Sequence, residues 1–210
     1  MTMLSLAQRI SPIAPVLNAG SQDGLVLVDL SLVPRSGAKG QDMAGWAAMA
    51  GLPLLDASNQ AVRHPKGGLV ARLSAGEILL LGDPFADDAS WISAAQTHLD
   101  RGHGLCYPVP RADSHAWFCV QGEDAPAMFA KVCGVDLRPK AFADLQIAQT
   151  SVARVNAIVL RDDQAFKDKA DFPCYHVLAD WPSARSLWGY LLDAMTEFGG
   201  QATSRDAPVR

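Results

Sequence analysis

An internal repeat constrains the fold of this 210-residue chain more than any other feature. Residues 40–73 match residues 122–155 at a constant offset of 82. The residues that match are Gly40, Asp42 and Val70-Ala71-Arg72 in the first copy and Gly122, Asp124 and Val152-Ala153-Arg154 in the second. Self-similarity of this kind predicts two copies of one structural unit.

The match continues farther along the chain at an offset of 97, which aligns Asp83, Trp91 and Gly102 with Asp180, Trp188 and Gly199. The change of offset means that the second copy carries 15 extra residues between Val155 and Tyr175. We expect this charged insertion to form a surface loop, because insertions are tolerated there.

Each copy predicts a strand, a helix, a hairpin and a second helix. Apolar residues at i, i+3, i+4 and i+7 mark the first helices, at 43–50 and 125–132. Asp42 and Asp124 precede these helices, and we expect their carboxylates to accept hydrogen bonds from the first-turn amides. The predicted hairpins pair 69–73 with 78–81 and 151–160 with 174–179, and the closing helices span 84–100 and 183–198.

The sequence therefore predicts an α+β protein of two similar sheet-and-helix units, each βαββα-like. We expect an N-terminal extension over 1–22, a first unit over 23–108, a second unit over 109–200 and a flexible tail over 201–210. Hydrophobic residues make up 49% and charged residues 19% of the chain, which is enough apolar material for a core.

Charge and hydropathy exclude several kinds of partner. A net charge of -4 makes nucleic acid a poor partner, because phosphate backbones select basic surfaces. We expect no membrane association and a cytoplasmic protein, since Arg9, Pro12 and Pro15 interrupt the N-terminal apolar residues. The four cysteines form no C-x-x-C pair, and we interpret them as reduced, buried side chains.

Cofactor and metal motifs are weak. The only G-x-G, Gly102-His103-Gly104, follows a predicted helix and lacks the third glycine of a dinucleotide site. Turn geometry explains the Gly/Lys segments 36–40 and 66–68 better than phosphate binding does. His98, His103 and Cys106 are compactly spaced, but no second Cys/His pair lies near them and zinc sites need three or four ligands at fixed spacings, so we assign no cofactor or metal residues.

Candidate catalytic groups also fail on geometry. On a strand, Asp113 and His115 would share one face and Ser114 would lie on the other, so the three could not relay a proton. The acidic pairs at 87–88 and 162–163 are adjacent in sequence, and we predict that both are solvated surface. No catalytic residue is assigned.

Two arginines and two tryptophans are candidates for structural or interface roles. Arg72 and Arg154 recur in the two copies between apolar neighbours, which predicts a paired buttress at the junction of the units or an anion or partner contact. Five tryptophans are too many for two small cores. We therefore predict an exposed apolar patch with at least one tryptophan, either Trp117 or Trp181, that docks against a partner.

Several motifs together resemble the γ-subunit family of heterotetrameric sarcosine oxidase. They are Gly122-Glu123-Asp124-Ala125, Cys133-Gly134-Val135-Asp136-Leu137, the segment 148–154 that contains Thr150, and the ending from Tyr175 to Gly199. The resemblance is strongest over 113–200 and makes Thr150 a further structural or interface candidate. It implies the folate-binding fold of the glycine-cleavage T-protein.

The resemblance also implies a function. The chain would be a non-catalytic γ-like subunit of a complex that oxidatively demethylates sarcosine or a related N-methyl amino acid. Larger flavin-binding subunits would be its partners and would hold FAD, FMN, NAD and tetrahydrofolate; alone, the chain could self-associate. The alternatives are a stand-alone folate-binding one-carbon (aminomethyl) transferase and a free-standing regulatory or structural module.

Overall fold

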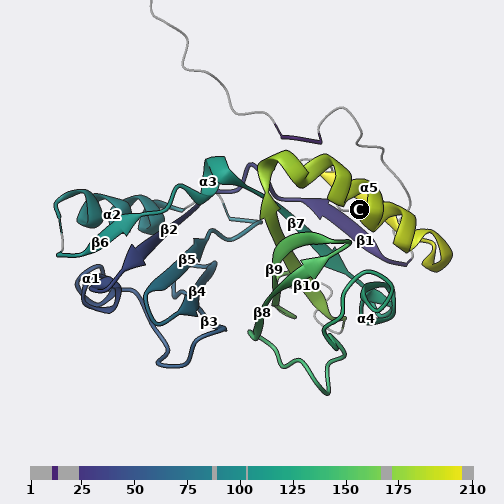
Figure 1. Ribbon diagram of the computed structural model, residues 1–210, viewed down its shortest axis with the longest axis horizontal. Coiled ribbons are helices and arrows are strands. Elements are labelled where there is room, and N and C mark those ends of the chain that lie inside the picture. Colours follow the sequence, from purple (N-terminus) through teal and green to yellow (C-terminus); the bar gives the residue numbers. More distant parts are fainter. Residues whose placement is uncertain (1–10, 14–23, 87–88, 103, 167–171, 205–210) are drawn as a thin grey trace, which may run out of the picture.

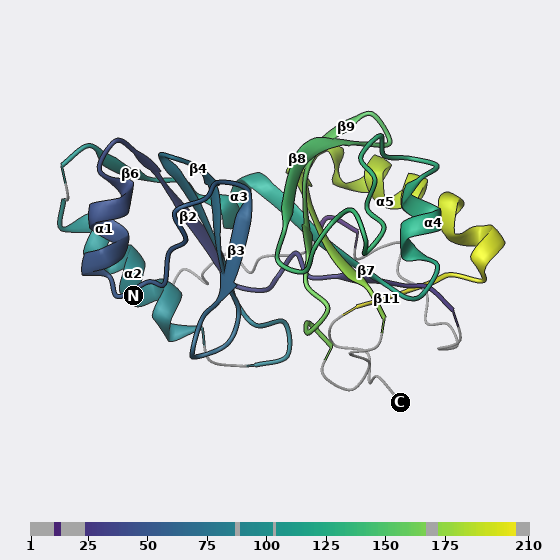
Figure 2. The same cartoon turned by 90° about the horizontal axis from the view of Figure 1, so that it is seen from below.

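The computed structural model describes residues 11–13, 24–86, 89–102, 104–166 and 172–204. The elements form four layers, with helices, a sheet, a second sheet and helices again (Figures 1 and 2). The two sheets lie in the middle and the helices cover their outer faces. This confirms the predicted α+β class with two sheet-and-helix units. No helix among the described residues is long and apolar enough to cross a membrane.

The first sheet has the strand order β3-β4-β5-β2-β6. Its strands are β2 (Arg35–Gly40), β3 (Gln60–Arg63), β4 (Leu69–Ser74), β5 (Glu77–Leu81) and β6 (Cys106–Pro108). The helices α1 (Met43–Met49) and α2 (Ser90–Asp100) pack on its outer face through Trp46, Trp91 and Leu99. The short helix α3 (Arg111–Ser114) leads from this unit into the next.

The second sheet has the strand order β11-β1-β7-β10-β9-β8. Its strands are β1 (Val26–Asp29), β7 (His115–Gln121), β8 (Ile147–Val152), β9 (Val155–Arg161), β10 (Cys174–Asp180) and β11 (Gln201–Ser204). Its outer face is covered by α4 (Ala125–Phe129) and α5 (Ala184–Met195), with 3₁₀ turns at Trp181–Ser183 and Thr196–Phe198.

A third apolar core joins the inner faces of the two sheets. Strand β7 illustrates how its residues are divided between cores, because Trp117 points into the inner core and Phe118 points outward onto Trp188 of α5. Both side chains are fully buried, because successive strand residues face opposite sides and both sides of this sheet are covered.

The repeat is visible in the backbone at two glycines. Gly40 ends β2 with φ 151°, and Gly122 follows β7 with φ 144°. A Cβ atom at Gly40 would lie 1.9 Å from the carbonyl oxygen of Leu105, and one at Gly122 would lie 2.7 Å from Leu25. Leu105 and Leu25 precede β6 and β1, which occupy the same place in the two sheet orders. Both positions therefore require glycine, because each has a positive φ and no room for a Cβ atom, and this shared requirement explains why the two glycines align at the offset of 82.

The helix caps differ from the prediction. Asp42 and Asp124 stand at the N-cap positions of α1 and α4, but neither side chain caps the helix. Asp42 Oδ2 instead accepts a hydrogen bond from the Leu105 amide at 2.8 Å. The carboxylate thus ties α1 to the start of β6.

The single strand predicted over 151–160 is wrong. A two-residue turn at Ala153 and Arg154, with φ of 49° and 65°, separates β8 from β9. Positive φ at both positions is the signature of a type I′ hairpin. In the described part of the chain the first sheet therefore has five strands and the second has six, against the three of a βαββα unit, and β3 and β8 are among the strands that were not predicted.

Two terminal strands belong to the second sheet although the sequence assigned them to the first unit and to the tail. β1, from the expected first unit, pairs with β7 of the second sheet. β11, from the expected flexible tail, pairs in parallel with β1. The boundary at 108–109 stays a prediction, but the second sheet draws strands from both ends of the chain. Residues 1–10, 14–22 and 205–210 of the predicted extension and tail lie outside the described residues.

Candidate functional site

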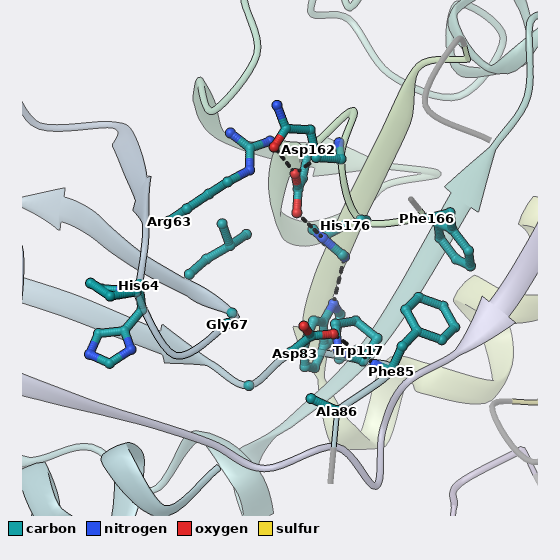
Figure 3. A pocket seen from close by; sticks show the side chains of 17 residues that line it. Arg63, His64, Gly67, Asp83, Phe85, Ala86, Trp117, Asp162, Phe166 and His176 are labelled. Atoms are coloured by element: carbon teal, nitrogen blue, oxygen red, sulfur yellow. Dashed lines mark hydrogen bonds and ion pairs between the residues drawn. The ribbon is translucent and has the colours of Figure 1, made fainter. Parts of the chain in front are cut away.

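A pocket of about 880 Å³ lies between the two sheets (Figure 3). Three loops surround it: 64–68 between β3 and β4, 82–86 after β5, and 162–166 after β9. Trp117 of β7 and His176 of β10 form its buried wall. The volume falls in the range typical of small-molecule sites.

A chain of polar contacts runs along the buried wall. The Trp117 indole N–H donates to His176 Nδ1 at 3.1 Å, and His176 Nε2 lies 3.5 Å from Asp162 Oδ2. An indole can only donate, so Nδ1 accepts and the imidazole proton sits on Nε2, facing the carboxylate. The indole thereby fixes the tautomer of the histidine.

Asp162 is buried at 7% exposure, so its predicted solvated position is wrong. The Arg63 guanidinium donates to its Oδ1, and the Gln164 amide donates to the same oxygen at 3.2 Å. Burial alone would raise the pKa of Asp162, but the hydrogen bond from His176 and the charge of Arg63 outweigh burial and lower it. Its neighbour Asp163 forms a bidentate pair with Arg161.

The β3–β4 turn forms a second wall. Gly67 and Gly68 have φ of 89° and 82°, and a Cβ at Gly68 would lie 2.2 Å from the Leu81 carbonyl oxygen. The glycines thus serve turn geometry and let the hairpin approach the loop after β5. His64 at the start of the turn stacks on Trp91, with ring centroids 4.0 Å apart. Burial and then Lys66 lower the pKa of His64.

The mouth of the pocket is aromatic and acidic. Phe85 and Phe166, from loops of different units, meet edge to face with centroids 4.8 Å apart. Asp83 Oδ1 accepts a hydrogen bond from the Phe85 amide at 2.8 Å, which holds the carboxylate and the ring on one turn. Figure 3 shows Asp83 between the His64 side and the phenylalanine side of the pocket.

The arrangement suits binding better than covalent chemistry. The thiols of Cys119 and Cys174 lie 2.9 Å apart and are fully buried, and neither lines the pocket. Both nitrogens of His176 are engaged, by Trp117 and by Asp162, and the Cys119 thiol that also interacts with the imidazole does not line the pocket. Within the described ranges, no three His, Cys, Asp or Glu side chains are arranged to hold a metal ion.

The structure separates Arg72 from Arg154. Arg72 is half-buried on β4 and donates to backbone carbonyls, including Leu55 at 2.8 Å. Arg154 is exposed in the β8–β9 turn. The predicted paired buttress is therefore wrong. Strand pairing makes Arg161, and not Arg154, the structural counterpart of Arg72. Ile78 pairs with Arg72, and Tyr175, which aligns with Ile78 at the offset of 97, pairs with Arg161.

Arg35 is the buried arginine at the junction of the units. Its guanidinium donates to the carbonyls of Ser31 at 2.8 Å and Val33 at 3.0 Å, and to three carbonyls of α3 and the first residue of β7. Those three belong to Arg111, Ala112 and His115. Sequence reasoning missed Arg35 because it has no counterpart in the second copy, where Trp117 takes the equivalent position.

Of the two tryptophans suggested for an exposed apolar patch, Trp117 is excluded because it is fully buried, whereas a patch that contains Trp181 stays a prediction. Trp117 is buried between the sheets, and Trp181 is half-buried against the outer core of the second sheet. The large apolar residues exposed on the described surface are Leu32, Met49, Leu55, Phe85, Leu105, Tyr107, Phe172 and Tyr190. Thr150 lines a separate polar groove with His115 and Asp180.

The segment Asp113-Ser114-His115 is not a strand throughout, because α3 ends at Ser114 and β7 begins at His115. Ser114 Oγ lies 2.8 Å from His115 Nδ1 and donates to the Pro110 carbonyl at 3.0 Å. Arg111 donates to His115 Nε2 at 2.9 Å. The serine therefore accepts from the histidine, which cannot act as its base. Burial and then Arg111 lower the pKa of His115 to about 4.

Two of the sequence-based observations fall where the structure gives no description. His103 of the weak metal and G-x-G motifs lies outside the described residues, as does the acidic pair at 87–88. Of the residues that form the pocket, only His176 carried a signal that could have been used. It is a histidine inside an otherwise apolar strand, which predicts a specific polar partner.

Comparison with known proteins identifies the fold. The chain superposes on a chain of heterotetrameric sarcosine oxidase from Corynebacterium sp. U-96 with a TM-score of 0.72 and 19% identity, covering 96% of this chain and 99% of that one. It also matches the glycine cleavage system aminomethyltransferase T from Bartonella henselae, with a TM-score of 0.55 and 16% identity, over 86% of this chain and 47% of that one. No family model and no curated protein matches the sequence. The chain therefore has the fold shared by these two proteins, as the sequence resemblance implied.

Proposed function

We propose that the chain is an accessory, γ-like subunit of a heterotetrameric oxidase of the sarcosine oxidase type. The complex would oxidatively demethylate sarcosine or a related N-methyl amino acid in the cytoplasm. Larger flavin-binding subunits would carry FAD, FMN, NAD and tetrahydrofolate, and this chain would have no catalytic residue of its own.

Mutual coverage is the observation that carries the proposal. The superposition spans 96% of this chain and 99% of the chain from the heterotetrameric oxidase. The T-protein match spans only 47% of that protein. A fold that corresponds to a whole chain of an assembly supports a subunit role better than it supports a stand-alone transferase.

The exposed aromatic residues are candidates for the contact with the larger subunits. Tyr107 and Tyr190 are 58% and 54% exposed on the described surface. Tyrosines with an exposed ring are enriched where proteins meet, and a few aromatic anchors supply much of the binding energy. They join Trp181 as candidates, since Trp117 is buried between the sheets.

The test is co-expression of the chain with candidate large subunits, followed by size-exclusion chromatography. We expect one complex in which flavin absorbance and this chain elute together, and we expect sarcosine-dependent turnover to need the large subunits. Tyr190→Ser and Tyr107→Ser should weaken the complex if either ring is an anchor. Separate elution at micromolar concentrations would reject the subunit role.

A folate-binding one-carbon transferase remains the second candidate, because the pocket between the sheets is large and has aromatic walls. The two functions differ in ligand binding by the isolated chain. An accessory subunit should give no heat on titration with tetrahydrofolate, whereas micromolar binding would favour the transferase.

A further inference from the structure

We propose that the pocket between the sheets binds a small organic ammonium ion, with Asp83 as its counter-ion and Phe85 and Phe166 as its aromatic walls. This goes beyond the accessory role, which gives this chain no ligand. It depends on the pocket alone and not on the presence of larger subunits.

Among the described residues, the acidic and arginine side chains that line the pocket are paired, with one exception. Arg63 contacts both Asp144 and Asp162, and Asp162 also faces His176. Asp83 differs, because its described partner is the amide of Phe85 in its own turn and no described cation pairs with it. A carboxylate in a partly enclosed pocket gains from a cationic partner, so Asp83 is the natural anchor for a positive ligand group.

The surroundings of Asp83 suit an organic cation. Phe85 is 47% exposed and meets the half-buried Phe166 edge to face, so that ring surface remains open beside the carboxylate. Aromatic faces attract ammonium groups, and quaternary ammonium ligands are bound by such cages. The hydrogen bond from the Phe85 amide to Asp83 fixes the acid and the first ring relative to each other.

Gly67 keeps the carboxylate accessible. A Cβ atom at position 67 would lie 2.9 Å from Asp83 Oδ2, and the residue has φ of 89°. Any side chain there would press on the carboxylate from the hairpin side. The positive φ of the turn already favours glycine at this position, and the missing side chain also leaves the hairpin side of the Asp83 carboxylate uncovered.

An anionic ligand fits less well. Arg63 is the one arginine among the described residues that line the pocket, and its Nη2 is already shared between Asp144 and Asp162. An anion placed near it would also face two or more carboxylates. The volume of about 880 Å³ exceeds what an ammonium group fills, so the ligand is a small molecule that carries the cation on a larger body.

The experiment is a titration of the full chain with choline and with its neutral carbon isostere, 3,3-dimethylbutan-1-ol, followed by calorimetry and by NMR. Tetramethylammonium and dimethylammonium complete the probe set. We expect choline to bind with a Kd on the order of 1 mM and the isostere to bind at least tenfold more weakly. Ligand-induced shifts should appear at resonances of Phe85 and Phe166.

Variants separate the counter-ion from the aromatic walls. Asp83→Asn should weaken choline binding about tenfold or more, and Phe85→Leu or Phe166→Leu should each weaken it several-fold. Asp193→Asn, on the exposed face of α5, is the matched control and should bind as the parent does. Thermal melts establish that each variant is folded.

Any of three results would overturn the proposal. The first is that no ammonium probe binds at roughly 50 mM, which is 50-fold the expected Kd. The second is that choline and its isostere bind equally well, and the third is that a folded Asp83→Asn variant binds choline as the parent does.

Discussion

At the scale of single residues, the buried guanidinium of Arg35 should matter most for stability. It is 3% exposed and donates to carbonyls on both sides of the junction between the units. Arg35→Met would leave these acceptors without donors, and we expect the free energy of unfolding to fall by about 3–5 kcal/mol. Urea denaturation measures the change. Arg185→Met, exposed on α5, is the control and should stay within about 0.5 kcal/mol of the parent. A loss below about 1 kcal/mol for Arg35→Met would mean that water replaces the guanidinium.

His115 should make the protein sensitive to mild acid. Its pKa is lowered to about 4 in the folded chain, by burial and then by Arg111, from an ordinary value of 6.5. The unfolded chain therefore binds the proton more readily, so the free energy of unfolding falls as pH drops from 6.5 toward 4 and is unaffected above that window. His115→Gln should remove roughly 1–2 kcal/mol of this dependence, after allowance for partial exposure. Urea midpoints at several pH values give the difference curve, and a difference that does not vary with pH would contradict the assignment.

At the scale of elements, the type I′ turn between β8 and β9 is built from unfavourable residues. Ala153 and Arg154 both adopt left-handed φ, which costs non-glycine residues about 1–2 kcal/mol each. Replacing the pair by Asn-Gly should raise the free energy of unfolding by about 1 kcal/mol. Ala75→Asn, in the β4–β5 turn where φ is negative, is the control and should give no gain. A destabilised Asn-Gly variant in a urea melt would show that the Arg154 side chain has a role of its own.

The elements also show what the sequence could predict. The β4–β5 hairpin and the helices α2 and α5 follow local periodicity, and the structure has them within a few residues at most boundaries. The four-residue β3 is too short to give a pattern. β1 and β11 were assigned to other segments because pairing between chain ends leaves no local signal. The pocket was missed for the same reason, since Arg63 and Asp162 are 99 residues apart in sequence.

At the scale of the whole molecule, the repeat does not produce two independent bodies. The inner core combines Leu79 and Leu81 of the first sheet with Trp117 and Leu178 of the second. β1 enters the second sheet from the N-terminal side of the first unit. Separating the units at 108–109 would expose the inner faces of both sheets and remove β1 from beside β7.

We therefore expect the chain to unfold in one cooperative transition. Tryptophan fluorescence and far-UV circular dichroism should give coincident urea curves, because tryptophans lie in all three cores. Leu79→Ala in the inner core should cost about 2–5 kcal/mol and shift both curves together. Met128→Ala, buried on the outer face of the second sheet, is the matched substitution and should also move both probes by the same amount. Two separated transitions, or a fragment of 109–204 that melts cooperatively as a monomer, would instead support the independent units that the repeat suggested.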